Sequence, residues 1–402
     1  MSASPTRSSS PHAGSHAAHS AHETVPEPAL PPSSSLPEPL QHHLAGAALD
    51  QPAGLQLPSY AYQLDVDSAS GSSNDHVRSD ADSALGESDA GSTTTSLNSE
   101  VVNYRYEHGR RYHAFKEGAY WLPNDEDEAD RLDLQHHVWR LSLDGALHAA
   151  PVPPNVQDVL DVGTGSGVWA IEFADENPSA QVIGTDLSAI QPEWVPPNVT
   201  FLVDDAESDW DFDGRKFDFI HARMLCLGMH NWQRFIEQCY RHLKPGGWLE
   251  LQEGQLPTRC DDDSVTKDDP LQKWAILVHE AAAKCGIDTM ASDKFPQQLR
   301  DQGFETITEQ VVKWAVGAWP KGQKQKMLGR WTLENLGRGL QGISVALLTK
   351  VLGWSKEEVD LFLIDVRQNM GDQSDPRSTS VGPTTWAISV GIIASLALRL
   401  LN

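Results

Sequence analysis

The sequence predicts an α/β protein of the Rossmann type, with a mostly parallel sheet flanked by helices. The first observation is a set of apolar positions, Val159, Leu160 and Val162, which suits a buried strand of a parallel sheet. The second is the glycine-rich turn that follows it, together with the helical spacing of residues 168–174. The third is that two further strands, 181–186 and 199–203, each lead into carboxylates. Ligands bind at the carboxyl ends of strands in open α/β sheets, so a ligand site is expected there.

The turn after the first strand has the sequence DVGTGSG, residues 161–167. Its three glycines let a bound molecule approach the backbone, because a Cβ would occupy that space. A dinucleotide fingerprint requires G-x-G-x-x-G, and here Val168 stands in place of the last glycine. The loop also lacks the lysine and hydroxyl residue of a P-loop. The pattern D-x-G-x-G-x-G instead resembles the first motif of class I methyltransferases that use S-adenosyl-L-methionine.

A sulfonium cofactor suits the carboxylates that follow the strands. It is positively charged and has no phosphates, so Asp186 and the acidic run 204–207 fit it better than they fit NADP. An acidic residue at the end of the second strand is also where a ribose diol is bound. Two other interpretations compete with this one. The ligand is NAD or FAD, or the turn is an ordinary strand–turn–helix whose glycines serve packing only.

A longer set of sequence words resembles the LaeA-like methyltransferases of fungi. The words are GRRYHAF (109–115), YWLPNDED (120–127), RLDLQHH (131–137), DLSAIQP (186–192), WVPPNV (194–199), FDFIHAR (217–223) and KPGGWLE (244–250). The likeness covers about residues 103–372, and so many ordered words are far more specific than one glycine motif.

The resemblance implies a class I methyltransferase fold: a mostly parallel seven-stranded sheet between helices. It also implies an S-adenosylmethionine-dependent enzyme of fungal secondary metabolism, either a regulator or a tailoring enzyme such as a small-molecule O-methyltransferase. A different class of function is a non-catalytic, cofactor-bound regulatory scaffold in a nuclear complex. The expected cofactor contacts are these: Asp161, Gly163, Gly165 and Gly167 at the methionine end, Asp186 at the ribose hydroxyls, and Asp205 at the adenine amino group.

His221 is the candidate general base, because it lies near the carboxyl end of the predicted fourth strand, 217–222. A base is needed when the acceptor is a hydroxyl or an ammonium group, and an imidazole has an ordinary pKa of about 6.5. The competing interpretation is that His221 only hydrogen-bonds the framework. The neighbouring Arg223 is expected to pair with an acidic strand end. By resemblance Tyr112 and Tyr120 lie near the substrate entrance, or they are simply half-buried aromatics.

Length and composition divide the chain of 402 residues into four parts. Residues 1–100 are rich in Ser, Pro, Ala, His and Asp and are expected to be disordered, since they cannot bury enough apolar surface. Residues 101–150 are expected to form a helical cap, and residues 151–372 the methyltransferase domain. Residues 373–402 depart from the family, being polar and then apolar. The last strand of the sheet is therefore in doubt.

The apolar end of the chain, 386–401, has three competing interpretations: a strand or helix packed on the domain, a tail anchor, or a product of alternative splicing. It is shorter than the roughly 20 residues that span a bilayer, so membrane association is the less favoured interpretation. A net charge of −25 argues against direct nucleic-acid binding. The four cysteines show no metal-ligand spacing, so no metal is expected. The expected partners are a small-molecule or protein methyl acceptor and regulatory proteins, in the nucleus or cytoplasm.

Overall fold

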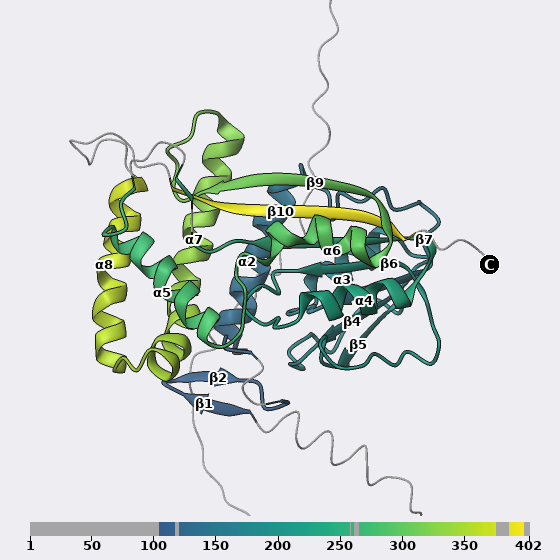
Figure 1. The fold of residues 1–402 in the computed structure, drawn as a ribbon, viewed down its shortest axis with the longest axis horizontal. Coiled ribbons are helices and arrows are strands. Elements are labelled where there is room, and N and C mark those ends of the chain that lie inside the picture. Colours follow the sequence, from purple (N-terminus) through teal and green to yellow (C-terminus); the bar gives the residue numbers. More distant parts are fainter. Residues whose placement is uncertain (1–103, 117–119, 258, 261–264, 375–385, 398–402) are drawn as a thin grey trace, which may run out of the picture. The chain divides into compact units, whose positions relative to one another are not determined.

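The computed structural model describes residues 104–116, 120–257, 259–260, 265–374 and 386–397 (Figure 1). All of them belong to one compact unit, Ala84–Asn402. The predicted disordered tail, 1–100, lies outside the described residues. The two main features of the described part are a large sheet and the helices packed against it.

The sheet confirms the predicted fold class. Its order is β5-β4-β3-β6-β7-β10, with β8 and β9 both pairing with β10. The strands are β3 (Asp158–Val162), β4 (Gln181–Asp186), β5 (Val199–Val203), β6 (Phe217–Arg223), β7 (Leu243–Gly254), β8 (Arg259–Cys260), β9 (Phe304–Ala315) and β10 (Trp386–Ala397). Strands β3 to β7 run parallel, while β10 is antiparallel to both of its long neighbours. The chain order reverses between β3 and β6, which places a ligand crevice above that pair of strands.

The parallel strands are apolar because helices cover both faces of the sheet. Val159 and Leu160 of β3 and Phe219 of β6 are completely buried. The helices flanking the sheet are α3 (Val168–Glu176), α4 (Trp232–His242) and α6 (Phe295–Gln302), the last preceded by the 3₁₀ turn η1 (Ala291–Lys294). The aromatic side chains of α3 and α4 enter the two apolar clusters against the sheet.

A second group of helices packs together at one end of the sheet (Figure 1). It consists of α5 (Pro270–Lys284), α7 (Gln323–Ala346), its π-helical extension η2 (Leu347–Val351) and α8 (Lys356–Ser374). Helix α8 begins with a capping box. Glu358 N–H donates to Ser355 Oγ at 3.1 Å, and Ser355 N–H donates to Glu358 Oε2 at 2.8 Å.

The segment before the glycine turn, expected to form a helical cap, is helical only in its second half. It begins with a hairpin, β1 (Arg105–Glu107) and β2 (Arg110–Tyr112). The two residues between these strands, His108 and Gly109, both have positive φ, at 50° and 80°, as a two-residue hairpin turn requires. Helix α2 (Glu126–Ser142) follows, with Asp125 at its N-cap and acidic residues in its first turn.

Residues 386–397 resolve the doubt about the last strand. They form β10, which lies between β7 and β9, with Ile393 opposite Leu251 on one side and Glu309 on the other. The segment is apolar because a strand with neighbours on both edges and helices over the sheet is buried. The preceding polar residues, 375–385, lie outside the described residues. Within the described ranges, no helix has the length and apolarity needed to cross a bilayer.

Candidate cofactor and acceptor site

A cavity lies at the carboxyl ends of β3, β4, β5 and β6, at the reversal of strand order. Helix α2 borders it opposite the strand ends, and Ile343 of α7 closes one wall. Its lining includes Tyr120, Leu122, Glu128, Arg131, Gln135, Gly163, Gly165, Asp186, Asp205, Arg223, Leu225 and Ile343. The cavity therefore brings together most of the predicted cofactor residues.

The glycine turn faces this cavity through two of its three glycines. Gly163 and Gly165 line the cavity and have φ of 70° and 59°, a left-handed conformation that glycine adopts without strain. A Cβ on Gly163 would collide with the side chain of Leu225, which packs directly against this glycine. Gly167 instead begins α3, and a Cβ there would meet the Phe201 ring at 2.5 Å. Gly167 thus serves helix–strand packing and does not line the cavity.

Asp161 lies beneath the turn and does not line the cavity. Its side chain is almost completely buried, and its Oδ2 accepts a hydrogen bond from Thr164 Oγ1 at 2.6 Å. Its Oδ1 lies 2.8 Å from His221 Nδ1, which carries the proton because a carboxylate only accepts. The carboxylate that was expected at the methionine end therefore shapes the glycine turn from behind.

Asp186 ends β4 and lines the cavity as predicted. Its Oδ2 accepts from Gly165 N–H at 2.9 Å, and its Oδ1 accepts from Ser188 N–H at 2.9 Å. Burial raises the pKa of this carboxyl group, and the two backbone donors oppose that shift. The hydrogen bonds fix the orientation of the carboxylate next to the glycine turn.

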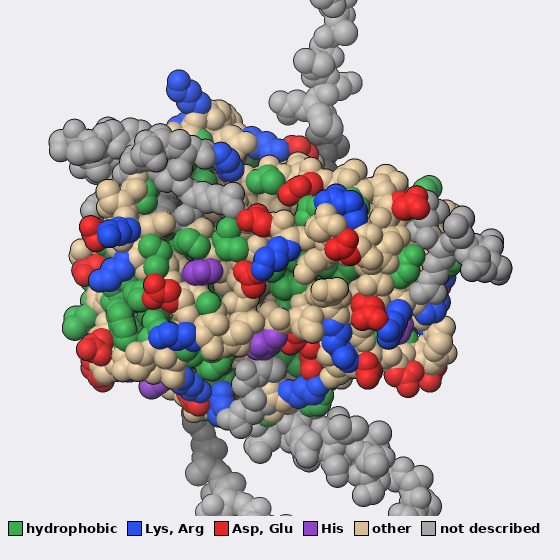
Figure 2. Space-filling model, viewed as in Figure 1, with side chains coloured by type: hydrophobic (Ala, Val, Ile, Leu, Met, Phe, Trp, Pro, Cys, Tyr) green, Lys and Arg blue, Asp and Glu red, His purple; other side chains and the backbone are tan. Residues whose placement is uncertain are grey.

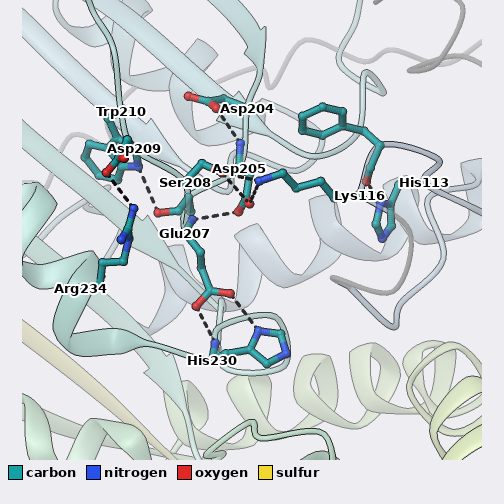
Figure 3. A network of polar contacts seen from close by, with 12 residues as sticks. His113, Lys116, Asp204, Asp205, Glu207, Ser208, Asp209, Trp210, His230 and Arg234 are labelled. Carbon is teal, nitrogen blue, oxygen red and sulfur yellow. Dashed lines mark hydrogen bonds and ion pairs between the residues drawn. The ribbon is translucent and has the colours of Figure 1, made fainter.

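Asp205 follows β5 and belongs to a polar network at the other end of the cavity (Figure 3). It accepts from Lys116 Nζ at 2.5 Å, from Glu207 N–H at 2.9 Å and from Ser208 Oγ at 3.0 Å. Burial alone would raise the pKa of Asp205, but these hydrogen bonds outweigh it and lower the pKa. Glu207 in turn accepts from the backbone and Nδ1 of His230, which anchors the segment that holds Asp205.

His221 does not occupy the position that a general base needs. Its side chain is completely buried, and its ring stacks on Trp169 with centroids 3.8 Å apart and planes 5° apart. It is absent from the cavity lining, because its strand position turns it towards α3 and not towards the crevice. An acceptor in the cavity therefore cannot reach this imidazole, and the prediction of a base at His221 is not supported.

Comparison with known proteins agrees with this geometry. Residues 131–309 match a family model described as a methyltransferase domain. Methyltransferase pytC of Aspergillus terreus is 41% identical over 281 residues, which cover 70% of this chain and 86% of that protein. The secondary metabolism regulator LAE1 of Cochliobolus heterostrophus is 40% identical, covering 65% of this chain and 87% of that protein. The chain belongs to the LaeA-like family of fungal methyltransferases.

Another LaeA-like relative carries a more specific name. The protein-methionine methyltransferase laeA of Emericella nidulans is 34% identical over 275 residues, covering 68% of this chain and 73% of that protein. The three relatives together carry the names of methyltransferases and of a regulator. Members of this family use S-adenosyl-L-methionine as cofactor.

The cavity of this LaeA-like chain fits that cofactor on its own chemistry. Gly163 and Gly165 present backbone without a side chain to the cavity, and two acidic residues, Asp186 and Asp205, lie at the carboxyl ends of neighbouring parallel strands. The glycine turn and the ends of β4 and β5 offer backbone groups and carboxylates, which suits a cationic molecule with a ribose diol and lacks the features of a phosphate site. The residues present are therefore consistent with the family's cofactor.

The far side of the cavity carries a buried ion pair that the sequence analysis missed. Arg131 Nε and Nη2 both donate to Glu128 Oε1, at 2.9 Å and 2.7 Å. Arg131 Nη1 donates to Asn335 of α7 at 3.0 Å. Tyr120 lines the same part of the cavity, and burial raises its pKa well above the usual range. The i, i+3 spacing of Glu128 and Arg131 on one helix was the only sequence signal for this pair.

Proposed function

We propose that this chain binds S-adenosyl-L-methionine along the carboxyl ends of β3 to β6 and transfers its methyl group to an acceptor held between α2 and α7. The observation that carries the proposal is the arrangement of one cavity. The glycine turn and two strand-end carboxylates line its sheet side, and a buried Glu128–Arg131 pair lies on its helical side. One part suits the cofactor, and the other suits a second molecule.

We assign the cofactor contacts to four of the six predicted residues. The methionine end of the cofactor lies against the backbone of Gly163 and Gly165. Asp186 accepts hydrogen bonds from the ribose hydroxyls, and Asp205 accepts one from the adenine amino group. Asp161 and Gly167 support this site from behind the turn and from the start of α3. The cofactor supplies an electrophilic methyl group, and its displacement requires in-line contact at about 3 Å.

The acceptor side supports a molecule with an apolar body and a hydrogen-bond donor. Leu122, Leu227 and Ile343 provide apolar lining there. The two hydrogen bonds that Arg131 donates to Glu128 both go to Oε1, which leaves the second carboxylate oxygen to accept from a hydroxyl or amine. We therefore assign to Glu128 the role of orienting the acceptor, and we assign no general base to His221.

Calorimetry with S-adenosylhomocysteine tests the cofactor assignment. The full chain is expected to bind it, and Gly163→Arg is expected to abolish binding because the new side chain would occupy the cavity beside Leu225. Gly337→Arg on α7 is the matched control, since nothing lies within 4 Å of a Cβ at that position. Binding that survives Gly163→Arg would refute the cofactor site.

The relatives' names support two roles in secondary metabolism, a tailoring enzyme and a regulator. Metabolite profiles of a deletion strain and a Gly163→Arg strain separate them. Loss of one methyl group from one product identifies a tailoring enzyme, and loss of many products identifies a regulator. Full function of the Gly163→Arg strain identifies the third candidate, a non-catalytic scaffold with protein partners in a nuclear complex. For either regulatory role we propose a nuclear location, and for tailoring a cytoplasmic one.

A further inference from the structure

Arg223 is a cation in the cavity that none of the roles above uses. It is the last residue of β6, and its half-buried side chain lines the cavity together with Gln135 and Gly163. Burial lowers the pKa of its guanidinium to about 10, so the group stays charged at neutral pH. From the sequence, Arg223 is expected to pair with an acidic strand end. In the described part of the chain no carboxylate lies within salt-bridge distance of it.

The one hydrogen bond that Arg223 makes to a described residue holds the guanidinium in place without neutralising it. Arg223 Nη2 donates to His136 Nδ1 at 3.1 Å. His136 Nε2 therefore carries the ring proton and donates to Glu172 Oε2 at 3.0 Å. Burial lowers the pKa of His136, which keeps this ring neutral. This series of hydrogen bonds, from Glu172 of α3 through His136 of α2, thus orients the guanidinium. The other N–H groups of Arg223 have no partner among the residues that the structure describes.

Asp161, Glu172 and Glu250 attract the Arg223 guanidinium only from beyond salt-bridge distance, so the cost of desolvating this half-buried cation is not fully offset by an ion pair. Arginine is the residue best suited to bind a carboxylate in a bidentate manner. The position of Arg223 indicates which carboxylate this is. Ala222 of β6 lies opposite Val162 of β3 in the parallel register, so the residues that follow, Arg223 and Gly163, leave the sheet side by side. The guanidinium therefore borders the methionine end of the cavity.

We propose that Arg223 binds the α-carboxylate of the methionine part of the cofactor. The inference rests on the proposed function, since it requires S-adenosyl-L-methionine in this cavity. Arg223 thus binds the anionic end of the ligand through its side chain, whereas the glycine turn contacts the ligand only through backbone groups. A carboxylate on the methyl acceptor has the same chemistry, and the experiment below separates the two sources.

The test compares two ligands by calorimetry on the full chain. S-Adenosylhomocysteine carries the α-carboxylate, and 5′-methylthioadenosine has the same nucleoside and sulfur without the amino-acid part. Arg223→Gln is expected to weaken binding of S-adenosylhomocysteine about 10- to 100-fold, as the loss of charged hydrogen bonds predicts. Binding of 5′-methylthioadenosine is expected to stay unchanged, which also shows that the variant is folded. Arg223→Lys keeps the charge without the bidentate geometry and is expected to lose less.

Arg140→Gln is the matched control. Arg140 lies on α2 and pairs with Glu172 at the outer end of the same chain of contacts, so this variant removes a nearby positive charge outside the cavity. Equal weakening of both ligands by Arg223→Gln would overturn the proposal, because it would show a general structural role. Unchanged S-adenosylhomocysteine affinity would also overturn it and point to the acceptor's carboxylate. Failure of the wild-type chain to bind either ligand would instead refute the proposed function.

Discussion

Trp169 and His221 form a flat stack in the interior of the protein, with ring centroids 3.8 Å apart and planes 5° apart. The same imidazole donates to Asp161, and Asp161 accepts from Thr164 in the glycine turn. The stack therefore links α3 to the turn through side chains that are all buried. His221 is a positioning residue in this arrangement, because it donates to the Asp161 carboxylate, which holds the glycine turn, and does not face the cavity.

Replacing His221 by Ala is expected to reduce the free energy of unfolding by about 3 to 5 kcal/mol, since it leaves a void beside Trp169 and a buried carboxylate without its partner. Denaturant unfolding measures this change. His230→Ala is the control, because His230 is partly exposed and pairs with Glu207 near the surface. A His221→Ala protein that is as stable as wild type, binds S-adenosylhomocysteine normally and yet cannot transfer methyl groups would restore His221 as the base.

Glu253 of β7 predicts a pH dependence of stability. Its carboxylate oxygens accept from the backbone N–H groups of Leu225 and Cys226, at 2.9 Å and 3.0 Å. Burial raises the pKa of Glu253 to about 8, from an ordinary value of 4.5. Between these two pH values the folded state holds a proton that the unfolded state has released. Stability is therefore lost as the pH rises through this window, by up to about 1.4 kcal/mol per pH unit.

Glu253→Gln isolates that contribution, because an amide does not titrate. The variant lacks one acceptor for the Leu225 and Cys226 amides, so it is expected to be less stable than wild type at pH 5. The difference in unfolding free energy between the two proteins should then narrow steadily towards pH 8. Unfolding curves at pH 5, 6, 7 and 8 measure it. A constant difference across that range would show that Glu253 has an ordinary pKa.

The sequence predicted those parts of the site that depend on strand position and backbone. An apolar strand followed by glycines must turn sharply at the sheet edge, so the places of Gly163, Gly165 and Asp186 follow from the order of residues along the chain. The same argument places Asp205, because it follows β5, the parallel neighbour of β4. These positions follow from topology, and side-chain direction does not affect them.

The depth of each side chain and the packing of helices are what the sequence could not supply. His221 and Arg223 are two residues apart on one strand and so project on the same face, yet His221 is buried against α3 and Arg223, at the end of the strand, lines the cavity. The Glu128–Arg131 pair depends on where α7 packs on α2, a contact between residues 204 positions apart in the case of Arg131 and Asn335. β10 was in doubt because its apolar run fits a strand, a helix or an anchor equally well, and only pairing with β7 and β9 decides among them.

Gly184 of β4, next to the site, has no space for a larger side chain. The Phe201 ring fills the space above this glycine, and an added Cβ would lie 2.6 Å from the ring and 2.9 Å from Thr164 Oγ1. Gly184→Ala is therefore expected to lower the free energy of unfolding by about 1 to 3 kcal/mol. Adding Phe201→Leu should recover part of that loss, since the smaller side chain gives way. Thermal or denaturant unfolding of the single and double variants measures the coupling.

Gly337→Ala provides the control for that series. Gly337 lies within α7, and nothing lies within 4 Å of a Cβ there. Alanine has the higher helix propensity, so this variant is expected to be more stable by up to about 1 kcal/mol. Equal effects of the two Gly→Ala substitutions would mean that the close approach of Phe201 to β4 is not a constraint on stability.

We expect strand β10, the apolar segment 386–397, to contribute to the stability of the domain. Ile393 is 1% exposed and packs in the same apolar cluster as Phe217 and Phe235. Ile393→Ala is expected to lower the free energy of unfolding by about 2 to 5 kcal/mol, because it leaves a void within the sheet's apolar layer. The control is Leu361→Ala on α8, because Leu361 is 66% exposed. Hydrophobic side chains lie among charged ones on the side of the molecule where Figure 1 labels α8 (Figure 2). Loss of the Leu361 side chain should change stability by less than about 0.5 kcal/mol.

The same pair of variants separates the strand from a membrane anchor. An anchor would leave the unfolding free energy of the Ile393→Ala protein close to that of wild type, since its apolar residues would contact lipid and not the domain. It would also make the wild-type chain float with phospholipid vesicles in a density gradient. Because the buried edges of β7 and β9 need the backbone partners that β10 supplies, we expect a destabilised variant and a wild-type chain that stays at the bottom of the gradient.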